Sequence, residues 1–226
     1  SRLRRCTCMS SQAELIAWGS SLLSTLEGDE GGATPVAEAR YLLTWALGVD
    51  SLLFAPREVP PTNEAAYRAA VTQRALRHPR SHVTGEMYFR GLVLSGGEGV
   101  FTVRPETEML VEHVEELAHS GAFPDGEWVD LCTGSAAIAL ALSTETGHQV
   151  TAVEIDSDAF AYAERNLARY PKARIRLVKG DATAPDTIRD LNGKTALVVT
   201  NPHYVPAQEA PTQIEEQHDP ECALYG

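Results

Sequence analysis

Apolar residues recur at helical spacing through the first third of the chain. Between residues 12 and 79 they stand three and four positions apart, which is the period of helices that bury one face. The series includes Leu15, Ile16, Leu22, Leu23, Leu26, Ala39, Leu42, Leu43, Ala46, Ala65, Ala69, Ala70 and Leu76. Stretches that contain Gly and Pro interrupt it at 28–35 and 55–62. The pattern predicts a small helical domain.

Short strand-like runs replace the helical pattern after residue 87. Residues 88–94 and 99–103 are rich in apolar and aromatic side chains, and they flank the turn-forming sequence Ser95-Gly96-Gly97-Glu98. This arrangement predicts a β-hairpin with its turn at 95–98. We expect the hairpin to join the helical domain to the rest of the chain.

From residue 128 onward, apolar runs of strand length alternate with helical patterns. The predicted strands are 128–132, 150–154, 175–179 and 196–200, and the predicted helices are 136–146 and 157–170. Such alternation is typical of an α/β domain with a parallel sheet. The expected parts are a basic N-terminal extension (1–11), a helical domain (12–80), a β-hairpin linker (81–104) and an α/β domain (105–226).

Polar residues follow the predicted strands of the α/β domain. Thr133-Gly134-Ser135 joins the first strand to a helix, as in nucleotide-binding folds. Glu154 ends the second strand 24 residues after Asp130, close to the ~20-residue spacing at which an acid meets ribose hydroxyls. Asp181 follows the third strand, where an adenine would lie within reach. The pattern predicts a nucleotide-like cofactor at one edge of the sheet.

The tetrapeptide Asn201-Pro202-His203-Tyr204 comes directly after the fourth strand. An amide nitrogen is a poor nucleophile, and two acceptors that hold its hydrogens aim it at a methyl donor. The Asn201 side-chain oxygen and the Pro202 carbonyl are candidates for those acceptors. The tetrapeptide alone fits an ordinary Asn-Pro turn equally well.

Together these segments resemble the class I S-adenosylmethionine-dependent methyltransferases, and more narrowly the HemK/PrmC family, which methylates a glutamine of peptide chain release factors. The family's Arg-Pro-Glu-Thr-Glu segment is intact at 104–108, and 47–50 and 82–85 are similar to its N-terminal half. The resemblance covers most of the chain, from about residue 37 to residue 226.

The resemblance implies a Rossmann-like methyltransferase domain that binds S-adenosylmethionine. The implied cofactor-binding residues are Asp130, Cys132, Thr133, Gly134, Ser135, Ala136, Glu154, Asp181, Ala182 and Asn201. Asn201 and Pro202 are the implied catalytic residues, and the implied substrate-binding residues are Phe101, Arg104, Asn201, Pro202, His203 and Tyr204. The helical domain would bind the release factor, and the class strand order would place 196–200 beside 128–132.

Three departures from the family pattern lie at the site. Cys132 and Ala136 stand where the family's cofactor loop has glycine, and His203 stands where it has a second proline. A degenerate relative, which binds cofactor or release factor weakly without turnover, is therefore an alternative. The family also continues through further strands after the fourth, so we expect an incomplete sheet whose open edge favours self-association.

Composition and charge exclude other classes. The chain has 226 residues and a formal net charge of −12, which disfavours tight binding to bare phosphate backbones and hence a DNA adenine methyltransferase. A dehydrogenase is disfavoured because no Gly-x-Gly-x-x-Gly follows Asp130. Four scattered cysteines indicate neither a disulfide framework nor a metal site, and no apolar run approaches a membrane span. We therefore expect a cytoplasmic protein without nucleic-acid or membrane partners.

Overall fold

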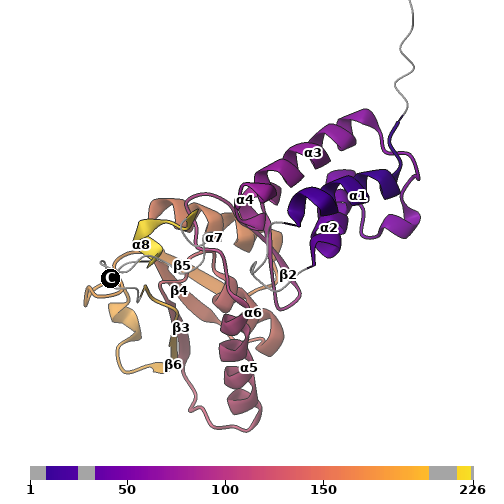
Figure 1. Cartoon of the computed structure of the whole chain (residues 1–226). Coiled ribbons are helices and arrows are strands. Elements are labelled where there is room, and N and C mark those ends of the chain that lie inside the picture. The colour runs from indigo at the N-terminus through magenta and orange to yellow at the C-terminus, as the bar shows by residue number, and fades with distance from the viewer. Residues whose placement is uncertain (1–8, 25–33, 204–217, 225–226) are drawn as a thin grey trace, which may run out of the picture. The chain divides into compact units, whose positions relative to one another are not determined.

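The computed structural model of the chain describes residues 9–24, 34–203 and 218–224 (Figure 1). The chain divides into two compact units, residues 1–84 and residues 85–226. Each unit has its own hydrophobic core.

The first unit is helical, as the apolar spacing predicts. Its elements are α1 (Gln12–Leu23), α2 (Pro35–Leu47), the 3-10 helix η2 (Leu52–Phe54), α3 (Pro61–Ala75) and α4 (Arg80–Thr84). Ser11 and Glu14 form a capping box at the start of α1, and Gly48 ends α2 with φ of 66°. At Gly19, a Cβ would lie 2.1 Å from the Tyr67 hydroxyl, so this glycine lets α1 and α3 approach closely.

A β-hairpin opens the second unit, but its position differs from the prediction. Its strands are β1 (Glu86–Phe89) and β2 (Leu92–Ser95), and the turn lies at Arg90-Gly91. The predicted turn at 95–98 is wrong, and residues 99–103 form no strand. Arg90 and Gly91 both have positive φ, 45° and 77°, which suits a tight two-residue hairpin turn.

Contacts on both sides of the turn explain the register. Met87, Phe89, Leu92 and Leu94 are buried together in the core of the second unit. The Arg90 backbone N–H donates to Glu108 at 2.9 Å, which helps to hold the left-handed turn. The predicted turn sequence instead packs on α7 (Ser157–Arg169), where a Cβ on Gly97 would lie 2.5 Å from the Tyr162 hydroxyl.

The rest of the second unit is an α/β domain. After α5 (Pro105–His119) come β3 (Glu127–Leu131), α6 (Ala137–Thr146), β4 (Val150–Glu154), α7, β5 (Ile175–Lys179), the 3-10 helix η3 (Arg189–Leu191), β6 (Thr195–Thr200) and α8 (Glu221–Leu224). The four predicted strands and two predicted helices are confirmed, with bounds that match or shift by one residue. The sheet is parallel in the order β5-β4-β3-β6, so β6 lies beside β3 as expected.

The register brings the carboxyl ends of all four strands to one edge of the sheet. Leu131 pairs with Val153 on one side and with Thr200 on the other, while Glu154 pairs with Lys179. α6 contacts β3 and β4 (Figure 1). Its alanines and leucines are buried. The loops that follow β3, β4, β5 and β6 therefore form one surface at this edge.

Candidate functional site

The loop after β3 has a left-handed backbone at three positions. Cys132, Gly134 and Ala136 have φ of 56°, 58° and 65°. The Thr133 N–H donates to the Val153 carbonyl at 3.0 Å, and the Ala136 N–H donates back to the Thr133 carbonyl at 2.9 Å. The chain thus reverses direction within a few residues and enters α6. Two of the three positions carry side chains where this conformation favours glycine, at a cost of about 1–2 kcal/mol each.

Asp130 lies fully buried beneath this loop. Its Oδ2 accepts hydrogen bonds from the Thr133 hydroxyl at 2.5 Å and from the Ala139 N–H at 3.2 Å. Within the described part of the chain, its Oδ1 has no hydrogen-bond partner. Burial raises the pKa of Asp130 to about 7, against the two hydrogen bonds, which lower it. The buried orphan oxygen is a ready acceptor for a cationic ligand group.

Glu154, at the end of β4, holds the same loop. Its Oε2 accepts from the Gly134 N–H at 2.7 Å, and its Oε1 accepts from the Ile155 and Asp156 N–H groups at 2.9 and 2.8 Å. The residue is only 7% exposed. Each carboxylate oxygen has two lone pairs, so Oε2 retains capacity for one further donor, such as a ribose hydroxyl.

A buried asparagine that the sequence analysis missed ties the loop to the hairpin. The Asn166 Nδ2 on α7 donates to the Ser135 carbonyl at 2.9 Å, and its Oδ1 accepts from the Ser95 N–H at 2.6 Å. Asn166 is completely buried. Its position on a helical face gives no sequence signal that sets it apart from solvent-facing polar residues.

Asp181 and Ala182 follow β5 at the same edge. The Gly180 N–H donates to the Glu154 carbonyl at 2.9 Å, so the end of β5 lies directly beside the end of β4. Asp181 is exposed, and hydrogen bonds from the Thr183 hydroxyl and N–H, at 2.7 and 2.8 Å, lower its pKa. Ala182 is half-buried.

Asn201 and Pro202 begin the segment after β6, on the other side of β3. The Thr200 hydroxyl donates to the Leu131 carbonyl at 2.8 Å and so joins the ends of β6 and β3. Asn201 is half-buried, and no hydrogen bond from the described residues engages its side chain. Pro202 and His203 are exposed, and Tyr204 lies outside the described residues.

The ends of β3 and β6 lie where the chain changes direction across the sheet. In open α/β sheets, ligands bind in the crevice at such a point. The exposed Cys132 thiol lies there, and its pKa is raised by burial and by Glu154, while the Thr200 hydroxyl lowers it. The structure therefore brings the loop after β3, Glu154, Asp181 and Asn201 to one edge.

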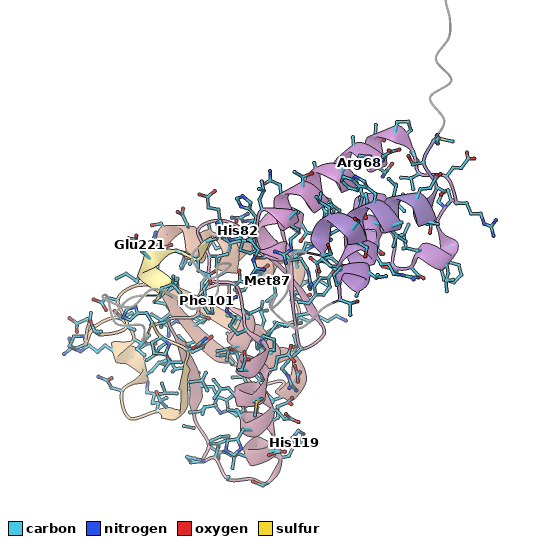
Figure 2. All side chains as sticks on the ribbon, viewed as in Figure 1. Arg68, His82, Met87, Phe101, His119 and Glu221 are labelled. Carbon is cyan, nitrogen blue, oxygen red and sulfur yellow. The ribbon has the colours of Figure 1, made fainter. Side chains whose placement is uncertain are left out.

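Phe101 and Arg104 lie on the segment between the hairpin and α5, where Figure 2 labels Phe101. The Arg104 guanidinium carbon lies 5.0 Å from the centre of the Phe101 ring. Arg104 Nη2 donates to Asp219 Oδ2 at 2.6 Å, and the Thr102 N–H donates to Asp219 Oδ1 at 3.0 Å. Sequence analysis also missed Asp219, because its partners lie more than a hundred residues earlier in the chain.

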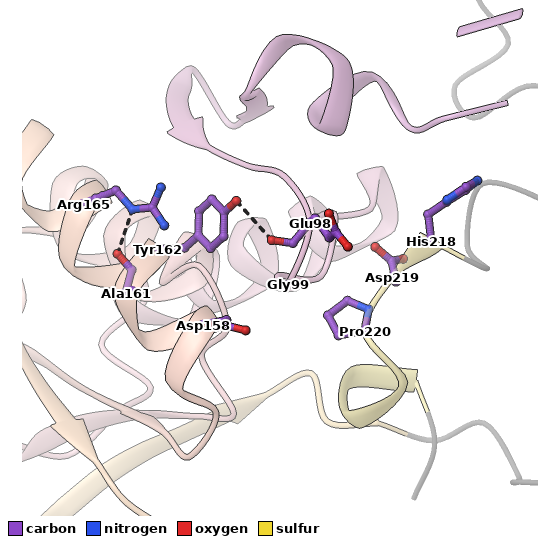
Figure 3. Close-up of a pocket in the computed structure, with 9 residues that line it drawn as sticks. All are labelled: Glu98, Gly99, Asp158, Ala161, Tyr162, Arg165, His218, Asp219 and Pro220. Carbon is purple, nitrogen blue, oxygen red and sulfur yellow. Dashed lines mark hydrogen bonds between the residues drawn. The ribbon is translucent and has the colours of Figure 1, made fainter. Parts of the chain in front are cut away.

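A cavity of about 590 Å³ adjoins Asp219 (Figure 3). It is lined by Glu98, Gly99, Asp158, Ala161, Tyr162, Arg165, His218, Asp219 and Pro220. The Tyr162 hydroxyl donates to the Glu98 carbonyl at 3.2 Å, and the Arg165 guanidinium stacks over the Tyr162 ring. Among the described residues, no cluster of His, Cys, Asp and Glu side chains is suited to hold a metal ion. None of the described helices is long and apolar enough to cross a membrane.

The parallel sheet, the left-handed loop after β3 and the acid that ends β4 define a Rossmann-like domain of the class I methyltransferase fold. Residues 129–219 match a family model described as a methyltransferase domain, and residues 14–85 match the PrmC N-terminal domain.

Curated relatives match most of the chain. The release factor glutamine methyltransferase of Bifidobacterium longum is 38% identical over 212 residues, covering 88% of this chain and 72% of the relative. That of Streptomyces coelicolor is 39% identical over 201 residues, covering 87% and 69%. The chain belongs to the family of release factor glutamine methyltransferases.

A solved structure of a Thermus thermophilus 16S rRNA N2 G1207 methyltransferase, in complex with AdoMet and guanosine, is similar to part of the chain. Its sequence is 20% identical, the match covers 59% of this chain and 36% of that one, and the TM-score is 0.43.

Proposed function

We propose that this chain transfers a methyl group from S-adenosylmethionine to the side-chain amide nitrogen of a glutamine in a peptide chain release factor. The family to which the chain belongs supports this reaction. The observation that supports the proposal is the position of Asn201. It directly follows β6 beside the end of β3, and its half-buried side chain makes no hydrogen bond to the described residues.

The residues at the sheet edge fit the cofactor. When bound, S-adenosylmethionine supplies an electrophilic methyl group on a positively charged sulfur. The unpartnered Oδ1 of Asp130 and the loop from Cys132 to Ala136 would hold its methionine end. The free lone pair of Glu154 Oε2 would accept from a ribose hydroxyl, and Asp181 and Ala182 would border the adenine.

Asn201 and Pro202 would orient the glutamine. The Asn201 side-chain oxygen and the Pro202 carbonyl each accept one hydrogen of the amide, so the nitrogen is held in one direction. A strong general base is unnecessary because the amide proton becomes acidic once the nitrogen carries the methyl group. His203 leaves the Pro202 carbonyl less rigid than a following proline would. We therefore expect His203→Pro to raise the transfer rate.

The helical unit is the proposed binding domain for the release factor. Leu53 and Phe54 on η2 are 87% and 89% exposed, and such an apolar pair suits a protein partner. The net charge of −12 disfavours direct nucleic-acid contact. Because release factors act on ribosomes, we expect the chain to work in the cytoplasm.

Mass spectrometry of a release factor incubated with the chain and S-adenosylmethionine tests the proposal. The parent should add one methyl group to a glutamine, and Asn201→Ala should abolish the transfer. Calorimetry should show cofactor affinity within about threefold of the parent, because the side chain acts mainly on the substrate. Asn192→Ala, at an exposed site beyond η3, is the matched control and should keep full activity. Equal rates for Asn201→Ala and the parent would refute the assignment.

A further inference from the structure

Asp219 is a buried acid whose two oxygens both serve one distant segment. Its side chain is 1% exposed, and it follows the Asn201–Tyr204 tetrapeptide in the sequence. Oδ1 accepts the Thr102 N–H at 3.0 Å, and Oδ2 accepts Arg104 Nη2 at 2.6 Å. Separating the carboxylate from the guanidinium would leave a buried charge uncompensated, which is energetically costly. The two groups therefore hold each other in place.

The segment that Asp219 contacts lies outside the helices and strands. Residues 101–104 belong to no helix or strand, and they connect the hairpin region to α5. Arg104 is the N-cap residue of α5 but makes no side-chain cap hydrogen bond. Its guanidinium, held at Asp219, lies over the Phe101 ring at 5.0 Å. Asp219, Arg104 and the Phe101 ring thus form one connected series of contacts.

We infer that Asp219 is a positioning residue for methyl transfer, an inference that rests on the proposed function. It joins the segment that follows the amide-binding tetrapeptide to the segment that carries Phe101 and Arg104, the proposed substrate-binding residues. Asp219 also lines the cavity of Figure 3, together with Asp158 and Glu98. We assign it no direct contact with the methyl donor or with the amide nitrogen. It acts through Arg104, whose fixed orientation sets one wall of the pocket for the glutamine.

We expect loss of the Asp219 charge to lower turnover more than substrate affinity. In the proposed complex the helical unit also binds the release factor, so a displaced pocket wall should cost little substrate affinity. A small misplacement of the reacting amide lowers the rate steeply, because the nitrogen leaves the line of attack. Asp219→Asn, which keeps the shape and the acceptor for Thr102 but loses the charge, should lower kcat about tenfold. The KM for the release factor should stay within about threefold.

A double-mutant cycle with Arg104→Gln tests whether Asp219 acts through Arg104. Each single variant should lower kcat about tenfold. The kcat of the double variant should be no more than about twofold below that of the less active single variant. Asp190→Asn, which disrupts the surface pair with Arg176, is the matched control and should keep parental kcat and KM. Additive losses in the cycle, or an Asp219→Asn variant with parental kcat, would overturn the inference.

Hydrogen exchange separates this inference from the proposed function. In Asp219→Ala, the Thr102 amide should lose protection relative to the parent, because its acceptor is gone. Unchanged protection at Thr102 overturns the Asp219 inference alone. A parent that methylates no glutamine overturns the proposed function and the positioning role together, whatever the exchange at Thr102 shows.

Discussion

Glu154 accepts a hydrogen bond from the Gly134 backbone N–H at 2.7 Å, so the acid that ends β4 also holds the loop that follows β3. The same carboxylate accepts two further N–H groups, from Ile155 and Asp156. The loop is thereby fixed in its left-handed path before any ligand binds. This support explains how Cys132 and Ala136 are kept at positive φ despite their side chains.

Restoring glycine in the loop should strengthen both folding and cofactor binding. Cys132→Gly with Ala136→Gly removes two side chains from positions with a left-handed backbone. The gain in stability is only partly offset by the greater chain entropy of glycine in the unfolded state, so the net stabilisation should be about 1 kcal/mol. S-adenosylmethionine should bind about tenfold more tightly in calorimetry, since backbone then approaches the ligand without hindrance.

Gly134→Ala is the matched control for the loop. Gly134 has the same backbone conformation, and a Cβ there would meet nothing within 4 Å. This substitution adds strain without a clash and should destabilise the fold by about 1 kcal/mol, the opposite direction. If the variant with Cys132→Gly and Ala136→Gly binds cofactor no more tightly than the parent, the side chains of Cys132 and Ala136 do not hinder cofactor binding.

Asp130 should make the stability of the protein fall as pH rises from about 4 to 7. Its pKa is raised to about 7 in the folded chain, whereas an unfolded Asp titrates near 3.9. Between these values the folded state holds a proton that the unfolded state has lost, so the free energy of unfolding decreases with pH. Urea unfolding of Asp130→Asn should lack this slope.

Asp190→Asn serves as the comparison for the titration. Its partner Arg176 lowers the Asp190 pKa, so that group titrates below the window. The Asp190 variant should keep the parental slope between pH 4 and 7. A parental slope in Asp130→Asn would mean that another group is responsible.

Arg90 should matter more for stability than an ordinary surface arginine. Its guanidinium is bound by Glu115 and Glu145, and its backbone N–H by Glu108. Burial and Glu145 raise the Glu115 pKa. Arg90→Met should cost about 2 kcal/mol of unfolding free energy, because the acids are then left near each other without a cation. The loss should be larger at pH 8 than at pH 5, where protonation relieves the repulsion.

Arg189→Met tests whether the loss of any arginine destabilises the protein to the same extent. Arg189 pairs with Asp186 on the surface, where both side chains are more than 70% exposed, and its loss should be barely measurable. Equal destabilisation by the two substitutions in denaturant titrations would contradict the role given to Arg90.

We expect the side of β6 that faces away from β3 to promote self-association. Among the described residues β6 pairs only with β3, and Val198 is 55% exposed. Light scattering should detect oligomers of the parent that Val198→Lys reduces, since a charge on an edge strand opposes pairing. Val36→Lys, at an exposed site on α2, should leave the oligomers unchanged. A monodisperse parent monomer would contradict the prediction.

Sequence patterns predicted the parallel sheet well and the hairpin poorly. The strand at 150–154 matches because a short apolar run has one stable place in a buried sheet. The strand at 175–179 also matches, although it lies at the end of the sheet order and its two basic residues are exposed. The hairpin register depends on whether Arg90 adopts positive φ, and that depends on contacts with Glu108 and Glu145, which lie far along the chain. Local turn preference pointed instead to the glycines at 96 and 97.

The site shows the same division between local and distant information. The loop, Glu154, Asp181 and Asn201 were predicted because each lies at the end of a strand or just after one. Asn166 and Asp219 were not, since their partners are separated from them by tens of residues or more. The left-handed backbone at Cys132 and Ala136 likewise required the structure, because their side chains favour other conformations.

The loop after β3 keeps the left-handed backbone conformation that favours glycine, although two of its positions carry side chains. Backbone dihedral angles therefore define this motif better than its amino-acid sequence does. A search pattern that demands glycine at 132 and 136 would pass over this chain. Relatives with similar replacements would be missed in the same way, and they would be found by asking for an acid at the end of the next strand that holds the loop's central N–H.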